Sequence, residues 1–188
     1  MIIDQTELPQ RLVYLSLSSA KDVVEAIKKM KIRGAPALAG AAAFGLYLGI
    51  KDSKAEVYNI FKEEIDSTAE IIRKSRPTAV NLFWGLERMV KKAEANKQKS
   101  ILEIKRILLK EAKDILEQDR LVCRKLAEIG SQLIKDNERI LTICNAGILA
   151  TVDYGTALGV IYTAKKQGKR IKVYACETRP LLQGARLT

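Results

Sequence analysis

Two short apolar runs near the end of the chain, separated by one helical segment, most constrain its fold. "RILTIC" (139–144) and "RIKVYAC" (170–176) are apolar and partly β-branched, which is typical of strands. Residues 148–167 between them predict an apolar and then basic helix that ends at Gly168. A strand, a helix and a strand at this spacing predict a βαβ unit and the beginning of a Rossmann-like parallel sheet.

The sequence ahead of this unit predicts a mainly helical domain. The expected helices cover 18–32 (with Ser19 as N-cap), 35–50, 51–74, the part of 75–96 that follows Pro77, and 100–134. We therefore predict an α/β chain with a helical N-terminal domain over 1–136 and the first part of a Rossmann-like domain over 137–188. Two parallel strands do not make a covered sheet, so we expect the sequence to be truncated at its C-terminal side.

The composition excludes several classes of partner. The net charge is +11, but lysines alternate with glutamates at helical spacing and aromatic residues are only 5%, which favours a solvated helix face over a nucleic-acid interface. The N-terminus has no apolar core of a signal peptide, and the most apolar stretch, 35–50, is short for a membrane span. We expect a cytoplasmic protein that binds neither nucleic acid nor membrane.

Acid–base and metal chemistry are restricted by residue type. The chain has no histidine, so proton transfer must fall to Asp, Glu, Cys, Lys or Tyr. Its three cysteines, Cys123, Cys144 and Cys176, are widely separated and lack the spacing of a metal site. We expect no metal, and we interpret Cys123 and Cys176 as structural.

Polar residues follow both predicted strands. Cys144 and Asn145 end the first strand, and Glu177 to Pro180 follow the second. Ligands of parallel α/β sheets bind at the carboxyl ends of the strands, so these loops predict a site. A lone cysteine is commonly a small buried hydrophobe, and the alternative for Cys144 is a thiolate nucleophile or base. The residues alone leave both interpretations open.

Two arginines precede predicted helices. Arg33 lies in "IRGAP" and Arg76 in "SRPTA", each in a turn. An exposed arginine is the ordinary interpretation, but a guanidinium beside the free N–H groups of a helix start is also suited to binding phosphate. Phe83 and Trp84 are predicted to be core residues of the helix over 75–96.

Four motifs in order give the chain a resemblance to a known family. "IRGAPALAGAAAFGL", "SRPTAVNLFWGLERM", "CNAGILATVDYGTALGVI" and "VYACETRPLLQGARLT" resemble the S-methyl-5-thioribose-1-phosphate isomerases. These enzymes of methionine salvage belong to a superfamily with the regulatory subunits of a eukaryotic translation initiation factor. The resemblance covers nearly all of the chain.

The resemblance implies a reaction and a set of residues. It implies isomerisation of 5-methylthioribose 1-phosphate to 5-methylthioribulose 1-phosphate by a homodimer without a cofactor. Cys144 matches the catalytic cysteine. The substrate-binding positions are Arg33, Gly34, Ala35, Arg76 and Gln183.

The resemblance also implies what these residues lack. The family's acid–base aspartate and an Asn-Lys pair that helps bind substrate lie beyond residue 188, so we expect this chain alone to be inactive or weak. Ile143 stands where the family usually has a histidine. Two alternatives stay open: a non-catalytic regulatory protein like the initiation-factor subunits, and a ribose bisphosphate isomerase.

Overall fold

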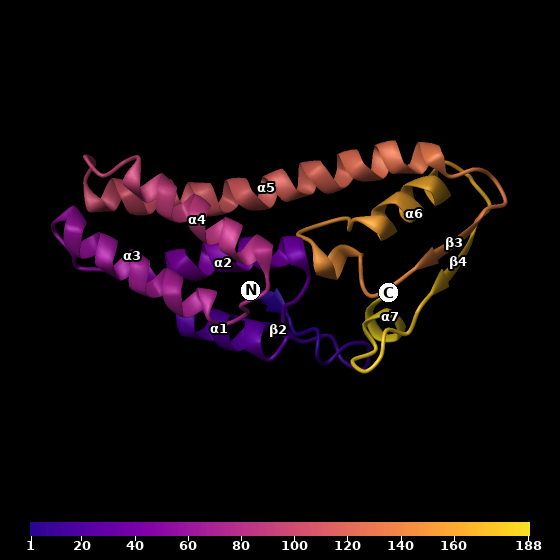
Figure 1. The fold of residues 1–188 in the computed structure, drawn as a ribbon, viewed down its shortest axis with the longest axis horizontal. Coiled ribbons are helices and arrows are strands. Elements are labelled where there is room, and N and C mark those ends of the chain that lie inside the picture. Colours follow the sequence, from indigo (N-terminus) through magenta and orange to yellow (C-terminus); the bar gives the residue numbers. More distant parts are fainter.

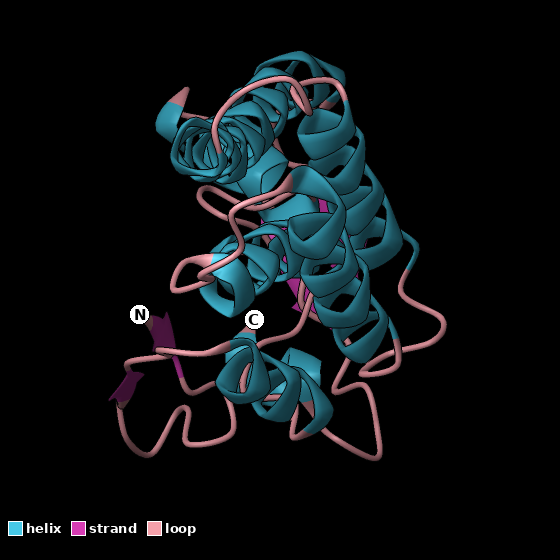
Figure 2. Cartoon of the chain, turned by 90° about the vertical axis from the view of Figure 1, so that its left-hand side faces the viewer, coloured by secondary structure: helices cyan, strands magenta, loops and turns pink.

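The computed structural model describes residues 1–188 as an elongated, mainly helical molecule. Helices α1 to α4 gather at one end, and β3, β4, α6 and α7 lie at the other (Figure 1). Helix α5 (Ile101–Leu133) runs along the molecule from one end to the other. The strands form only a small part of the structure (Figure 2), so the predicted α/β chain with a dominant helical part is confirmed.

Side-chain caps define the starts of two helices. Helix α1 (Ala20–Lys28) begins after Ser19, which accepts a hydrogen bond from the backbone N–H of Asp22, while the Asp22 carboxylate accepts from the backbone of Ser19. Ser100 and Glu103 form the same reciprocal arrangement at the start of α5. Such capping boxes satisfy N–H groups that a helix start leaves free. The predicted N-cap at Ser19 is confirmed.

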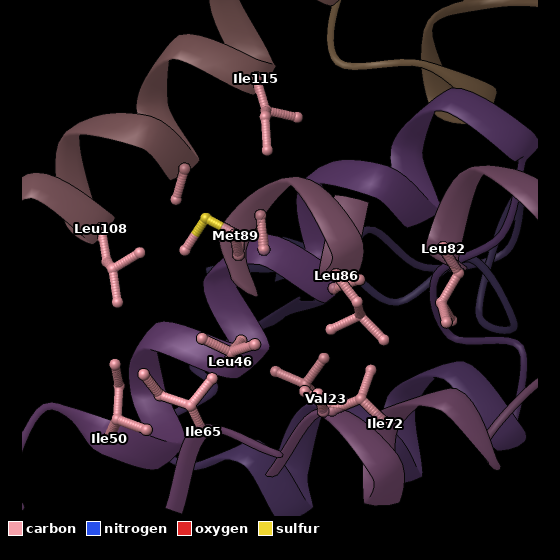
Figure 3. Close-up of a cluster of buried hydrophobic side chains, with 14 of the residues drawn as sticks. Val23, Leu46, Ile50, Ile65, Ile72, Leu82, Leu86, Met89, Leu108 and Ile115 are labelled. Atoms are coloured by element: carbon pink, nitrogen blue, oxygen red, sulfur yellow. The ribbon is translucent and has the colours of Figure 1, made fainter. Parts of the chain in front are cut away.

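Helix α2 (Ala35–Ile50) lies at the centre of the helical part and contacts α1, α3 (Tyr58–Arg73), α4 (Val80–Glu94) and α5. It is apolar on all sides, as expected for a helix packed on all sides. Its small residues allow close approach: a Cβ at Gly45 would lie 3.0 Å from Val23. Side chains from all five helices meet in one buried cluster (Figure 3).

Two predictions in the helical part are wrong. The helix expected from residue 51 begins only at Tyr58, because residues 51–57 form a turn and an extended segment after α2. Trp84 is 46% exposed rather than buried, with the Arg88 guanidinium over its ring at 5.3 Å, and Phe83 is half-buried outside the core cluster. Leu82, Gly85, Leu86 and Met89 provide the buried face of α4 instead.

The two predicted strands form a parallel pair. Strand β3 (Arg139–Thr142) pairs with β4 (Lys172–Ala175), with Arg139 opposite Lys172 and Thr142 opposite Ala175. Helix α6 (Ala157–Lys166) connects them and packs on α5. The predicted βαβ unit is confirmed, and Gly168 follows α6 with the positive φ of 86° that favours glycine. The domain boundary near residue 136 stays a prediction.

The connection after β3 differs from the prediction. A helix was expected over 148–167, but only a 3₁₀ turn, η1 (Ile148–Ala150), follows the strand before a loop leads into α6. Gly155 in this loop has a φ of 83°, and Tyr154 has a φ of 48°; both interrupt a regular helix. The result is a long connection between the end of β3 and the start of α6.

The N-terminal residues form a small hairpin that the sequence did not reveal. Strands β1 (Ile2–Ile3) and β2 (Tyr14–Leu15) pair antiparallel. At the other end of the chain, α7 (Gln183–Leu187) is the last element of the structure. None of the helices combines the length and apolar character that crossing a membrane requires.

Candidate active site

Three loops line an open cavity of about 610 Å³. They are the segment before α2, the segment before α4, and the stretch from the end of β3 to the start of α6. The lining residues are Arg33, Gly34, Ala35, Pro36, Leu38, Arg76, Thr78, Ala79, Val80, Asn81, Cys144, Asn145, Ala146, Ala150, Thr151 and Thr156. The cavity therefore brings together five of the six predicted site residues.

Arg33 and Cys144 are in direct contact inside this cavity. The Arg33 guanidinium Nη2 donates to the Cys144 Sγ at 3.4 Å. Burial of the sulfur acts to raise the pKa of Cys144, but the hydrogen bond from Arg33, the backbone N–H of Asn145 and the charge of Arg33 outweigh it and lower the pKa. A lowered pKa increases the fraction of Cys144 present as thiolate near neutral pH. The thiolate is the reactive form of a cysteine.

Several buried donors around the cavity have no partner. They are the Nε and Nη1 of Arg33, the Nη1 of Arg76 and the Nδ2 of Asn145. Buried polar groups are nearly always hydrogen-bonded, so a cluster of donors without protein partners is available to an acceptor on a ligand. No carboxylate lines the cavity. Two guanidinium groups and an amide without acidic neighbours are suited to an anion such as phosphate.

Gly34 allows the first loop to lie against the third. Its φ of 106° is in the region that favours glycine, and a Cβ there would lie 2.3 Å from the Cα of Ala150. No side chain caps the start of α2 at Gly34. Ala35, the first residue of α2, lines the cavity together with Arg33 and Gly34.

The loop after β3 is held by the loop after β4. The backbone N–H of Cys144 donates to the Thr178 hydroxyl at 2.8 Å, and both residues have a φ of 61°. A positive φ is unfavourable for these residue types, above all for a β-branched threonine, and such strain is found at functional sites. Sequence reasoning missed Thr178, although the polar stretch after the second strand was the available signal.

Gln183 does not line the cavity. It is the first residue of α7 and is half-buried. Helix α7 is packed closely against the end of β4, since a Cβ at Gly184 would lie 1.7 Å from the Cys176 carbonyl oxygen. The substrate-binding role of Gln183 stays a prediction.

The other two cysteines differ from Cys144. Burial, followed by the charge of Asp119, raises the pKa of Cys123 to about 11. Cys123 is therefore a neutral thiol inside α5 at physiological pH. Cys176 is a half-buried free thiol at the end of β4. The structure contains no group of three His, Cys, Asp or Glu side chains arranged to hold a metal ion.

The sequence pattern of the initiation factor 2 subunit family matches residues 31–188. The chain belongs to this family. Within it, the chain is 50% identical over 187 residues to the 5-deoxyribose 1-phosphate isomerase of Moorella thermoacetica, covering 100% of this chain and 53% of that protein. It is 50% identical over 188 residues to the methylthioribose-1-phosphate isomerase of Geotalea uraniireducens, covering 100% of this chain and 54% of the relative.

A solved structure of the same family has the same fold. The crystal structure of 5-methylthioribose 1-phosphate isomerase from Pyrococcus horikoshii OT3 superposes with a TM-score of 0.91 at 39% identity. The match covers 98% of this chain and 52% of that one. This member of the initiation factor 2 subunit family thus spans about half the length of the relatives it matches.

Proposed function

We propose that the cavity is the active site of an aldose–ketose isomerase that converts 5-methylthioribose 1-phosphate to 5-methylthioribulose 1-phosphate in methionine salvage. The observation that carries this proposal is the pairing of Cys144 with Arg33, beside guanidinium N–H groups that have no partner. A thiol with a lowered pKa can transfer a proton, and the free N–H groups can hold a phosphate. The choice of this sugar phosphate as substrate rests on the names of the related enzymes.

The residues have distinct proposed roles. Arg33 and Arg76 bind the phosphate, together with the backbone at Gly34 and Ala35. The Cys144 thiolate takes the proton from C2 of the sugar as the bond between C1 and the ring oxygen breaks and a C1–C2 double bond forms. A proton goes to the ring oxygen, the 2-hydroxyl loses its proton to become the ketone, and C1 gains a proton. Atoms balance, and no redox cofactor is consumed.

The proton for the ring oxygen needs a donor that these residues do not supply. The lining of the cavity contains no carboxylate, and the resemblance assigns this step to an aspartate beyond residue 188. We therefore propose that the 188-residue polypeptide assayed alone has weak or no turnover. Loss of one acid–base partner typically costs about 10²–10⁴-fold in rate.

The substrate class includes two close alternatives. The names of the two relatives differ only in the substituent at C5, methylthio or hydrogen, so 5-deoxyribose 1-phosphate is the natural competitor. A ribose bisphosphate would need a second cationic cluster, whereas the cavity has only Arg33 and Arg76 as charged lining residues. The monophosphate substrates are therefore favoured.

A regulatory protein is the second candidate, because the family is named for initiation factor 2 subunits. It requires neither a thiolate nor unpaired arginines in a cavity, so the site favours an enzyme. We further propose a cytoplasmic homodimer without nucleic acid or membrane partners. The +11 charge does not alter this proposal, since lysines such as Lys62, Lys110 and Lys125 pair with acids on the same helix.

The deciding experiment is an assay of 5-methylthioribose 1-phosphate turnover. It compares the 188-residue chain with a fusion that adds the second half of the Geotalea relative, each with Cys144→Ala and, as matched control, Cys176→Ala. We expect the fusion to turn over the substrate, Cys144→Ala to abolish this, and Cys176→Ala to retain it. A fusion that stays inactive, or an active Cys144→Ala fusion, would contradict the proposal.

A further inference from the structure

Gln5 is a buried polar residue near the N-terminus, and its role is not explained by the cavity alone. It lies in the turn after β1, is only 4% exposed, and does not line the cavity. Its neighbour Asp4 is equally buried and forms an ion pair with Lys31 at 3.3 Å. Glutamine is rarely buried unless its amide is used, so its contacts are informative.

Three hydrogen bonds tie Gln5 to separate parts of the molecule. Its backbone N–H donates to the carbonyl of Lys31 at 3.0 Å. Its side-chain Nε2 donates to the carbonyl of Leu149 at 2.7 Å. Its own carbonyl accepts from the Arg186 guanidinium at 2.9 Å. Because a carbonyl only accepts, the side-chain atom that faces Leu149 is the amide nitrogen.

Two of these partners adjoin the walls of the cavity. Lys31 lies two residues before Arg33, in the first wall. Leu149 lies in η1, next to Ala150, whose backbone is the surface against which Gly34 packs. Gln5 is thus a bridge between the loop that carries Arg33 and the loop that carries Cys144. These are the loops that the 3.4 Å contact between guanidinium and sulfur must bring together.

We propose that Gln5 is a positioning residue that holds the Arg33 loop against the Cys144 loop and so maintains the hydrogen bond to the thiol. Gln5 does not line the cavity, so its effect passes through Lys31 and Leu149. Describing the pair as catalytic rests on the proposed function. The positional claim itself concerns only the thiol and its neighbour.

The alternative is that Gln5 merely stabilises the fold. A structural role predicts that its loss lowers the unfolding temperature and affects all cysteines alike. A positioning role predicts a specific change in Cys144, because a weaker contact with Arg33 reduces the thiolate fraction at neutral pH. Comparing the ionisation of Cys144 with that of another cysteine therefore distinguishes a positioning role of Gln5 from a structural one.

The test measures the rate of alkylation by iodoacetamide against pH, resolved by peptide mass spectrometry for Cys144 and Cys176. Gln5→Met keeps the length of the side chain and removes the donor to Leu149, while Gln10→Ala changes an exposed glutamine of the same segment. We expect Gln5→Met to move the Cys144 midpoint to higher pH and to slow its alkylation at pH 7 severalfold. Each unit of pKa is about tenfold in thiolate. Cys176 and the Gln10→Ala chain should be unchanged.

Two results would overturn the proposal: a Cys144 midpoint in Gln5→Met equal to that of the unaltered chain, or an equal change at Cys176. If Gln5→Met does not fold, Gln5→Glu replaces it, since it retains length and polarity but lacks the N–H donor when ionised. The assay needs no substrate. An absence of isomerase activity would therefore not contradict the role of Gln5. An unchanged Cys144 midpoint in Gln5→Met would likewise not contradict the proposed isomerase activity.

Discussion

The guanidinium of Arg33 donates a hydrogen bond to the thiol of Cys144, although 111 positions separate them in the chain. Arg33 lies in the helical part of the molecule and Cys144 at the end of the first parallel strand. Their contact joins the two parts where the cavity opens. Burial acts to raise the pKa of this thiol, and the hydrogen bond and charge that lower it come mainly from Arg33, an element distant in sequence.

Replacing Arg33 should therefore change the chemistry of Cys144. In Arg33→Met the hydrogen bond and the positive charge are lost while burial of the sulfur remains, so the pKa of Cys144 should rise. We expect the pH midpoint of Cys144 alkylation to move upward and the rate at pH 7 to fall. Arg76→Met is the matched control, because Arg76 lines the same cavity without a hydrogen bond to the sulfur. Equal midpoints in both variants would contradict this interpretation.

Gly34 should tolerate no side chain. In Gly34→Ala the new Cβ would meet the backbone of Ala150 at 2.3 Å, and the φ of 106° is unfavourable for alanine. We expect the free energy of unfolding to fall by about 2 kcal/mol or more, combining backbone strain with the displacement of η1. Urea unfolding monitored by circular dichroism measures it.

Gly168 is a control that measures the cost of backbone strain without close packing. It also has a positive φ, 86°, but a Cβ there would meet nothing within 4 Å. Gly168→Ala should therefore cost only about 1 kcal/mol, the strain of the left-handed conformation. If the two variants lose equal stability, close packing against Ala150 is not what requires Gly34.

Local patterns were sufficient to predict most of the fold. The cap at Ser19, the apolar run from Ala35 and the two β-branched runs each depend on neighbouring residues, so their elements are visible in the sequence. The start of α3 depends on a turn that no strong signal marks, whereas Gly155 was an available signal for the break between η1 and α6. Trp84 was misplaced because it lies on the exposed face of α4, whose buried positions are occupied by Leu82, Leu86 and Met89.

The sequence was sufficient to predict most of the residues of the site, but not the hydrogen bonds between them. The cysteine at a strand end and the arginines before helices have local signatures. The hydrogen bonds from Arg33 to Cys144 and from Cys144 to Thr178 join distant segments, and periodicity carries no information on them. Gln5 has no signature at all, since its burial follows from how the hairpin and η1 meet.

Glu111 should make the stability of the helical part depend on pH. Burial raises the pKa of this carboxylate, but Lys92 at 2.8 Å and Arg88 at 2.5 Å outweigh burial and lower it. A lowered pKa stabilises the folded state above the unfolded value of about 4.3 and loses this contribution as pH falls through the folded value. Stability should therefore decline below about pH 4 as Glu111 takes up a proton.

Replacing Glu111 should remove this component. Glu111→Gln leaves two cations beside a neutral amide, and because Lys92 and Arg88 are partly exposed we expect a loss of about 1–2 kcal/mol near pH 7. The difference from the unaltered chain should shrink as pH falls. Urea unfolding from pH 3 to pH 7 measures it, with the exposed Glu117→Gln as control. A difference that stays constant with pH would contradict the ion-pair explanation.

The open sheet should cause self-association of the chain. Strands β3 and β4 form a two-stranded sheet; Leu141 within β3 is 73% exposed, and Ile143 just after it is 67% exposed. Unpaired edges with apolar neighbours favour pairing with another chain, and an introduced lysine opposes it. We expect the mass from light scattering to rise with protein concentration and Leu141→Lys to reduce this. Ile71→Lys, at an exposed position on α3, should not. A monomer at every concentration, or equal effects of both lysines, would exclude the sheet as the contact.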